Sequence, residues 1–318
     1  MPQSLFPLKF LKRRAYERLI REKDLLASLV RINSTPILRP TQGHSPAVCI
    51  IFSMDRAPQL HALLGSYFEQ VKNAVPIHVL YRTSNVQHQK AYEEVFLLFK
   101  NRPVFPIQQT SRESFKLQLL LVLKSINSDK VFFLTDDDLF IDDVDLLDVV
   151  KFETRTKIFS LRMGAHLTKS YPVQKEQKLP PFMSGVVEDS DKLCWFWENG
   201  EYDWAYPLSV NGHFFSTQEF LVLVNYTEFD SPNTLEANLQ QYAKYFQHRC
   251  GICYKRSKIL NIPINKVQND NKNICGTIHQ NYLLEQWSRG MQINYRALYG
   301  LVNESAHQDV TITFVKRT

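Results

Sequence analysis

Three consecutive aspartates are the sharpest chemical feature of the chain. Asp136, Asp137 and Asp138 directly follow an apolar stretch in the sequence FFLTDDDLFI. Side chains along a strand alternate faces, so Asp136 and Asp138 are predicted to point the same way and Asp137 elsewhere. Two carboxylates on one side suit a single Mg²⁺ or Mn²⁺, which prefers oxygen ligands. The alternative is a solvated acidic loop, although three adjacent like charges repel unless a cation is close.

Charge is unevenly distributed along the chain. The 318 residues have a formal net charge of +6, yet residues 136–148 hold seven aspartates and no basic residue. Residues 1–31 carry eight lysines and arginines against three acidic residues. A basic protein with one concentrated group of carboxylates suits a metal ion and a polyanion such as a nucleotide diphosphate better than nucleic acid. We therefore expect no nucleic-acid partner.

Alternating strands and helices are predicted to position these carboxylates. From residue 47 onward, continuous apolar stretches alternate with amphipathic ones, which favours an α/β fold with a mainly parallel sheet flanked by helices. The predicted strands or extended pieces are 47–54, 76–82, 104–107, 130–138 and 156–164; the predicted helices are 57–71, 88–99, 111–126 and 234–246; and 214–224 fits either. Such sheets bind ligands beyond the carboxyl ends of their strands, and one of those ends carries the aspartates.

The N-terminal region is predicted to form a basic amphipathic arm. Residues 15–31 place apolar side chains at helical spacing among arginines and lysines, and prolines and a glycine then mark a linker up to residue 46. The helix either docks on the body of the protein or lies on an anionic membrane surface. The longest apolar runs are about five residues, far below the ~20 of a membrane-spanning helix. We expect a cytoplasmic protein, with peripheral attachment to the cytoplasmic face of a membrane as the alternative.

The strands at 47–54 and 76–82, the helix at 111–126 and the strand ending in TDDD together resemble the nucleotide half of the GT-A superfamily of nucleotide-sugar glycosyltransferases. The resemblance covers about residues 47–310. It implies a Rossmann-like fold, a DxD motif, Mn²⁺ or Mg²⁺, a nucleotide-sugar donor and a glycan or lipid-linked acceptor. The chain then divides into the arm (1–46), a nucleotide-sugar-binding half (47–155) and an acceptor-binding half with a C-terminal tail (156–318).

The same resemblance implies residue roles around the donor. Asp136 contacts the nucleoside or sugar, and Asp138 binds the metal. Ser53, Arg56 and Arg82, at or just past the ends of the first two strands, match the positions where the superfamily binds the nucleobase and ribose. Arg112 and Lys116 lie one turn apart on the helix at 111–126 and could reach a diphosphate. Those two cations are otherwise ordinary surface charges on a helix edge. The predicted donor-binding residues are Ser53, Arg56, Arg82, Arg112, Lys116, Asp136 and Asp137.

A histidine near the end of the chain completes the predicted metal site. His307, in the sequence NESAHQD, resembles the distal histidine ligand of many metal-dependent members of the superfamily. The alternative is a polar surface histidine. The predicted metal ligands are therefore Asp138, Asp136 and His307.

An aromatic stretch is predicted to hold the acceptor. WFWENGEYDWAY contains Trp195, Trp197 and Trp204, and His213 follows in NGHFF. Sugars stack their C–H faces on aromatic rings, while core packing is the competing use of such rings. Asp203 between the rings favours an exposed surface, so these four aromatic and histidine residues are predicted to bind the acceptor.

A carboxylate is needed if the reaction inverts configuration. Glu236 is predicted in the first turn of a helix capped by Ser231 or Asn233, where inverting members of the superfamily place a catalytic acid residue. Asp203 is the second candidate. Glu236 could instead only complement the helix dipole, and a retaining enzyme needs no such base.

Two other classes of function remain open from sequence. A carbohydrate-binding protein would use the tryptophan stretch but leave the three aspartates unexplained, and a metal-dependent phosphotransferase or nuclease would need a second set of carboxylates. Cys250, Cys253, Cys275 and His279 have spacing that could hold structural zinc, with buried thiols as the alternative.

Overall fold

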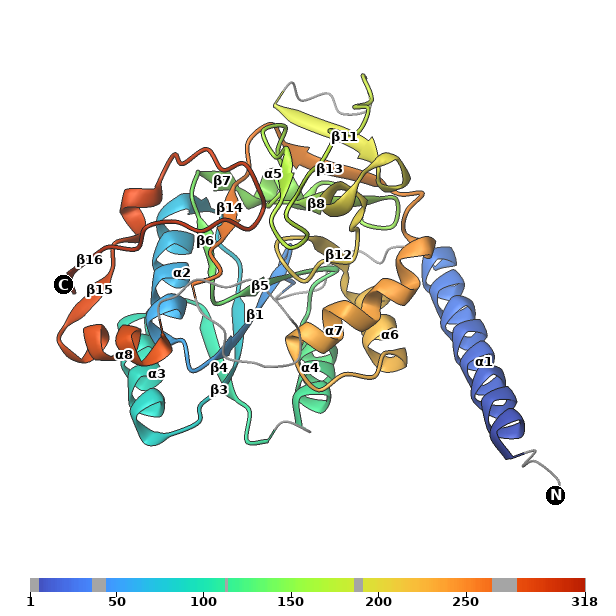
Figure 1. Cartoon of the computed structure of the whole chain (residues 1–318), viewed down its shortest axis with the longest axis horizontal. Helices are drawn as coiled ribbons and strands as arrows, with labels where there is room; N and C mark the ends of the chain where they lie inside the picture. Colours follow the sequence, from blue (N-terminus) through green and yellow to red (C-terminus); the bar gives the residue numbers. More distant parts are fainter. Residues whose placement is uncertain (1–5, 36–43, 112–113, 186–190, 265–278, 318) are drawn as a thin grey trace.

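The computed structural model describes residues 6–35, 44–111, 114–185, 191–264 and 279–317 (Figure 1). Its centre is a five-stranded sheet with the order β12-β5-β1-β3-β4. Strands β5, β1, β3 and β4 run parallel, and β12 pairs antiparallel with β5. Helices cover both faces, so the predicted mainly parallel α/β fold with an N-terminal helix is confirmed. These strands are β1 (Val48–Met54), β3 (Ile77–Arg82), β4 (Val104–Gln108), β5 (Lys130–Thr135) and β12 (Phe214–Ser216).

The helices around this sheet follow the predicted order. They are α2 (Ala57–Gln70), α3 (Val86–Leu98), α4 (Ser114–Ser125), α6 (Thr217–Tyr226) and α7 (Pro232–Leu239). Cys49 and Ile51 of β1 pack on one face of the sheet with α2 and α3, and Ile50 and Phe52 pack on the other with α4 and α6. A strand buried on both faces explains the continuous apolar run of β1.

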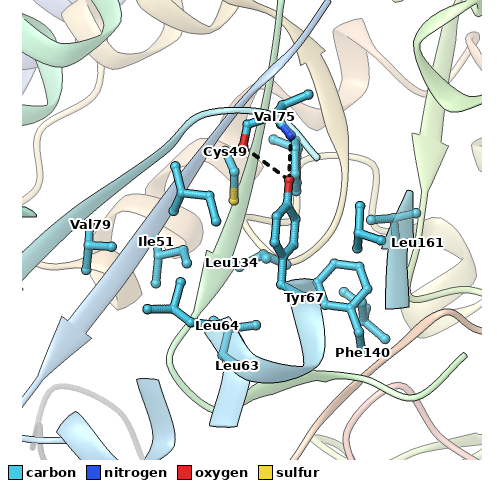
Figure 2. Close-up of a cluster of buried hydrophobic side chains, with 14 of the residues drawn as sticks. Cys49, Ile51, Leu63, Leu64, Tyr67, Val75, Val79, Leu134, Phe140 and Leu161 are labelled. Carbon is cyan, nitrogen blue, oxygen red and sulfur yellow. Dashed lines mark hydrogen bonds between the residues drawn. The ribbon is translucent and has the colours of Figure 1, made fainter. Parts of the chain in front are cut away.

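Tyr67 of α2 shows how the first of these cores accommodates a polar atom (Figure 2). Its hydroxyl accepts a hydrogen bond from the Val75 N–H at 2.9 Å and donates to the Val75 carbonyl at 3.3 Å. The ring packs against Phe140 in a T-shaped arrangement with centroids 5.4 Å apart. A buried hydroxyl without partners would cost free energy, so this pairing lets α2 press directly on the sheet.

Smaller sheets, most of whose strands come from the second half of the chain, accompany the central one. The remaining strands are β2 (Val71–Lys72), β6 (Asp138–Phe140), β7 (Val144–Asp145), β8 (Lys157–Ser160), β9 (Lys169–Ser170), β10 (Lys175–Glu176), β11 (Lys192–Phe196), β13 (Cys250–Tyr254), β14 (Ile259–Asn261), β15 (Met291–Ile293) and β16 (Phe314–Lys316), and the remaining helices are α5 (Leu146–Val150) and α8 (Gln280–Ser288). Strands β11, β13 and β8 make one sheet, and β14 pairs antiparallel with β6.

Several predicted boundaries differ from the structure. The strand predicted at 130–138 ends at Thr135, because the chain turns at Asp136 and Asp137 and starts β6 at Asp138. The segment 214–224 is both a strand and a helix, β12 followed by α6. The helix predicted at 234–246 begins earlier, because Ser231 and Thr234 form a capping box, and it becomes a 3₁₀ helix after Leu239.

The N-terminal helix α1 (Phe6–Ser34) is longer than the predicted 15–31. Leu25 and Leu29 in its C-terminal half are buried with Phe220 and Leu223 of α6. Its N-terminal half extends away from the body of the molecule (Figure 1). Among the described helices, α1 included, none combines the length and apolar character needed to cross a membrane.

Candidate functional site

Asp136 lies where the carboxyl ends of β1 and β5 meet. Its carboxylate accepts hydrogen bonds from the Ser53 hydroxyl at 2.8 Å, the Met54 N–H at 3.1 Å and the Arg56 guanidinium at 2.9 Å. Ser53 and Met54 end β1 and Arg56 follows it, and the parallel β1–β5 pairing brings them to the same edge as Asp136. Burial raises the pKa of Asp136 to about 6, even though Arg56 opposes the rise.

Arg56 connects Asp136 to the next carboxylate. The same guanidinium nitrogen lies 3.1 Å from Asp137. Tyr92 of α3 fixes this segment, because its hydroxyl is 2.5 Å from the Ser53 hydroxyl and accepts the Arg56 N–H at 3.1 Å. We call Ser53, Arg56, Asp136 and Asp137 the carboxyl edge. All four were predicted to bind the nucleotide-sugar donor, and hydrogen bonds connect them in one group.

Asp138 hydrogen-bonds a different set of residues from Asp136, contrary to the predicted common orientation of the two carboxylates. Its carboxylate accepts from the Thr135 N–H at 2.8 Å, from Asn211 at 2.7 Å and from Asn261 at 3.0 Å. The reason is the turn at Asp136, which ends the alternation of β5 before Asp138 begins β6. Burial, followed by the negative charge of Asp137, raises the pKa of Asp138 to about 7.

Asn261 joins the aspartates to the C-terminal segment. It lies opposite Asp138 in the β14–β6 register, and its amide also donates to Asp137 at 2.8 Å. Its carbonyl oxygen is 2.9 Å from Nδ1 of His307. Nε2 of His307 is 3.2 Å from Arg162, which can only donate, so the ring proton belongs on Nδ1. Burial and the Arg162 charge lower the pKa of His307 to about 4, which keeps the ring neutral.

Arg162 hydrogen-bonds one of the two predicted catalytic carboxylates, and its charge influences the pKa of the other. It donates to Oδ1 of Asp203 at 2.8 Å, and both side chains are buried. Oδ2 of Asp203 and Nε of Arg162 are buried without a hydrogen-bond partner. Glu236 accepts from the Ser209 hydroxyl at 2.8 Å and the Val210 N–H at 3.1 Å. Burial raises its pKa, and the Arg162 charge opposes that rise.

We call Arg162, Asp203, Glu236 and His307 the Arg162 cluster. Hydrogen bonds connect it with the carboxyl edge through Asn261. The order of connected side chains is Asp136, Arg56, Asp137, Asn261, His307, Arg162 and Asp203. A polar line of this kind can bind a charged ligand at one end and take a proton from a substrate at the other.

The predicted metal ligands are not gathered around one point. In the parts of the chain that the structure describes, no group of three His, Cys, Asp or Glu side chains is placed to hold a metal ion. Asn261 separates His307 from the aspartates. The two ring nitrogens of His307 contact Asn261 and the cationic Arg162, so neither is directed at a metal ion shared with the aspartates. Asp137 and Asp138 share Asn261 and supply carboxylate oxygens, which fits a cation that also takes phosphate oxygens from a ligand.

The other predicted donor residues have mixed positions. Arg82 ends β3 and lies opposite Met54 in the β1–β3 register, at the same edge as Arg56. Lys116 on α4 forms an ion pair with Glu228 at 3.3 Å and lies near the ring of Phe229. That pairing fits the surface alternative considered for Lys116. Arg112 lies outside the described residues.

The predicted acceptor platform is corrected by burial. Trp195, Trp197 and Trp204 have no exposed surface, and the first ring packs edge-on against the other two with centroids 4.7 and 4.9 Å apart. Rings without exposed faces cannot stack on a sugar, so these indoles are core. His213 is also fully buried, with Nδ1 3.1 Å from the Pro207 carbonyl. Burial and the Arg162 charge lower its pKa to about 3.

Four residues of the site were not predicted from the sequence: Arg162, Asn211, Asn261 and Tyr92. Arg162 follows β8 by two residues, but the strand predicted at 156–164 extends past it, so no cation at a strand end was visible in the sequence. Asn261 ends β14, a three-residue strand too short to show a pattern. Asn211 lies two residues before the histidine that was singled out instead.

The cysteines show no zinc geometry in the described part of the chain. Cys250 and Cys253 are three apart on β13, so they point to opposite faces of the strand. Cys253 packs beside Trp195 in one core, and Cys250 packs against the other. His279 caps α8 and accepts the Asn281 N–H at 3.2 Å, and Cys275 lies outside the described residues.

Comparisons with known proteins give only distant structural similarity. No protein-family model and no curated protein sequence matches the chain. A crystal structure of Staphylococcus aureus TarS (residues 1–349) is 15% identical with a TM-score of 0.42, covering 66% of this chain and 58% of that one. The apo structure of the bifunctional glycosyltransferase WbbM is 11% identical with a TM-score of 0.34, covering 64% and 38%.

A third similar structure is a mannosyltransferase from Pyrobaculum calidifontis in complex with GDP-Man and Mn²⁺. It is 14% identical with a TM-score of 0.30, covering 50% of this chain and 53% of that one. This chain therefore spans between 38% and 58% of the length of these three solved chains. At such identities and TM-scores, the proposals below rest on the geometry of the site.

Proposed function

We propose that the protein is a metal-dependent glycosyltransferase that moves a sugar from a nucleotide diphosphate donor to a hydroxyl of a glycan or a lipid-linked acceptor. The observation that supports this most is the continuous hydrogen-bonded line from Asp136 to Asp203. It begins beyond the carboxyl ends of parallel strands, where α/β sheets bind nucleotides. It ends at the buried carboxylate of Asp203, which suits proton transfer, and Glu236 lies outside this line.

The carboxyl edge is proposed to bind the donor. Ser53 and Arg82 would border the nucleoside. Asp136 accepts three hydrogen bonds from the protein, one of them from Arg56, and thereby orients Arg56 toward the nucleotide. Asp137 and Asp138 are the residues that would hold Mn²⁺ or Mg²⁺ together with the diphosphate. The ion would supply charge stabilisation of the leaving nucleoside diphosphate.

The Arg162 cluster is proposed to activate the acceptor. Glu236 is favoured as general base because burial raises its pKa, which brings a carboxylate closer to the pH at which it works. Asp203 is the alternative, because Arg162 fixes Oδ1 and leaves the buried Oδ2 without a partner. Both roles assume inversion of configuration. The acceptor would reach these carboxylates without stacking on the buried tryptophans.

The direct test is a panel of nucleotide sugars incubated with the full chain in Mn²⁺, in Mg²⁺ and in EDTA. We expect the wild-type protein to release nucleoside diphosphate from one class of donor only when metal is present. The Asp136→Asn variant should release none. Release of inorganic phosphate or cleavage of a nucleic acid would assign the site to a phosphotransferase or nuclease. If no nucleotide binds with or without metal, the proposal is wrong.

The tryptophan stretch gives a carbohydrate-binding protein no support, because its three indoles are buried. A binding-only protein predicts retention on immobilised glycan without consumption of any donor. The same panel, paired with a glycan-affinity column, separates that outcome from transfer.

A further inference from the structure

Helix α1 has two apolar faces, and only one of them packs on the protein. Leu25 and Leu29 are buried against α6, and Glu22 pairs with Lys244 at 2.7 Å. A groove of about 660 Å³ lies beside this contact, bordered by Arg18 and Arg21 among other residues. One side of α1 is thereby fixed in place, which determines where the other side points.

The opposite face of α1 carries exposed apolar side chains. Tyr16, Leu19 and Val30 are 64%, 63% and 64% exposed, and Ile20 is 41% exposed. Nine residues separate Tyr16 from Leu25, which at 3.6 residues per turn is about half a turn around the helix. The other three positions fall within roughly 60° of Tyr16 by the same geometry. They form a single stripe that we call the outer stripe of α1.

Basic residues accompany the outer stripe. Arg13, Lys23 and Arg31 are exposed on this side or its border. Helix α1 as a whole holds eight lysines and arginines against three acidic residues, a net charge of +5. Apolar side chains among cations on one helix face match a membrane surface that offers acyl chains beside negative headgroups.

We propose that the outer stripe of α1 lies on an anionic lipid surface. A second copy of the chain is the competing occupant, because the stripe could also form a coiled-coil contact. Two parallel helices of net charge +5 repel each other, whereas the same charge attracts phosphate headgroups. The proposal is independent of the proposed transfer reaction, because it uses neither the carboxyl edge nor the Arg162 cluster.

The test is flotation of the full chain with vesicles. One set contains phosphatidylcholine alone, and the other contains equal parts of phosphatidylcholine and phosphatidylglycerol. We expect flotation only with the second set, and release at high salt because salt screens the attraction. Equal flotation with both sets, or with neither, overturns the proposal.

Variants show whether lipid binding depends on the outer stripe or on exposed apolar side chains in general. Leu19→Gln with Ile20→Gln is expected to lower partitioning at least about tenfold, since two exposed apolar side chains are lost. The matched control is Leu97→Gln on α3, because Leu97 is 64% exposed against 63% for Leu19. An equal loss in the Leu97 variant contradicts a specific stripe.

A charge variant has its own control. Lys23→Gln is expected to lower partitioning about fivefold, the equivalent of one cation near an anionic surface. Lys100→Gln, at an exposed position on the body, should change nothing. Sedimentation equilibrium completes the set: a dimer that the Leu19 and Ile20 variants dissociate, together with absent flotation, assigns the stripe to a second copy and overturns the lipid proposal.

Discussion

The carboxyl edge and the Arg162 cluster are built in different ways. Ser53 and Arg56 stand at the end of β1, and Asp136 at the end of the neighbouring β5, so one strand pairing brings them together. Arg162, Asp203, Glu236 and His307 come from four segments that lie far apart in the sequence. Regular parallel strands position residues by a rule that a sequence reveals. The Arg162 cluster depends on tertiary contacts that no local pattern encodes.

The largest effect is expected at the junction of the two regions. Asp138→Asn should abolish transfer, because it removes a carboxylate proposed to hold the cation with the diphosphate. The free energy of unfolding at neutral pH should hold or rise, because burial already disfavours the charge. Donor consumption and urea denaturation measure the two effects. The control is Asp143→Asn in the same acidic run, whose exposed carboxylate lies 3.6 Å from Lys72 and should be dispensable. Near wild-type turnover in Asp138→Asn would remove Asp138 from the metal site.

The second prediction concerns the base within the Arg162 cluster. Glu236→Gln should lower turnover by a factor of roughly 10² to 10⁴, the usual contribution of a positioned general base. Donor affinity should persist, because the carboxyl edge lies on other elements. Steady-state kinetics and nucleotide titration give both values.

Asp203→Asn is the matched comparison for that variant. If Asp203→Asn loses turnover while Glu236→Gln keeps it, Asp203 is the base. If both variants stay active, inversion through this cluster is excluded, and the cluster only positions the neighbouring chain.

The sequence predicted the central sheet well because β1, β3 and β5 are apolar on both faces and separated by helices of ordinary length. It also predicted Ser53, Arg56 and Asp136 together, since all three follow directly from strand ends. The orientation of Asp138 could not be predicted, because the strand alternation stops at a two-residue turn. The burial of Trp195, Trp197 and Trp204 was missed for another reason: acidic residues beside aromatic rings indicate exposure, but Asp203 is buried with Arg162 as its partner.

A third prediction tests that burial. Trp195→Ala should lower the free energy of unfolding by about 3–5 kcal/mol, because a fully buried indole leaves a cavity. Tyr202→Ala in the same stretch should cost far less, since Tyr202 is 39% exposed. Urea denaturation of the two variants measures the difference. Equal small losses, with a raised KM for the acceptor in Trp195→Ala alone, would restore the stacking platform.

The smallest expected effect is a difference in pH dependence between Asp138, next to the carboxyl edge, and His213, next to the Arg162 cluster. The pKa of Asp138 is raised to about 7 from about 3.9 in an unfolded chain, so the folded state holds more protons between these values. Its contribution therefore lowers the free energy of unfolding as pH rises from about 4 to about 7, by at most about 1.4 kcal/mol per pH unit. The stability advantage of Asp138→Asn over wild type should widen over the same rise.

His213 should show the opposite sign. Its pKa falls to about 3 from about 6.5 in an unfolded chain, so the folded state holds fewer protons and stability is lost as pH falls below about 6.5. The free energy of unfolding of His213→Asn, relative to that of wild type, should rise as pH decreases, whatever the absolute stability of the variant. Urea denaturation midpoints measured across the pH range give the slope of stability against pH for Asp138→Asn, for His213→Asn and for wild type. Parallel slopes for the two variants would show that neither side chain titrates differently on folding.

The antiparallel strand β12 has a consequence for how the protein is made. It covers the outer edge of β5 through pairs such as Phe214 with Phe132, although it is encoded much later in the chain. At roughly 5–20 residues per second, the intervening ~80 residues take several seconds to leave the ribosome. During that time the apolar sequence KVFFLT has an unpaired edge that can join another strand. A nascent or truncated chain that ends near residue 155 is therefore expected to aggregate, and chaperones that shield this edge should raise the yield of the full-length protein.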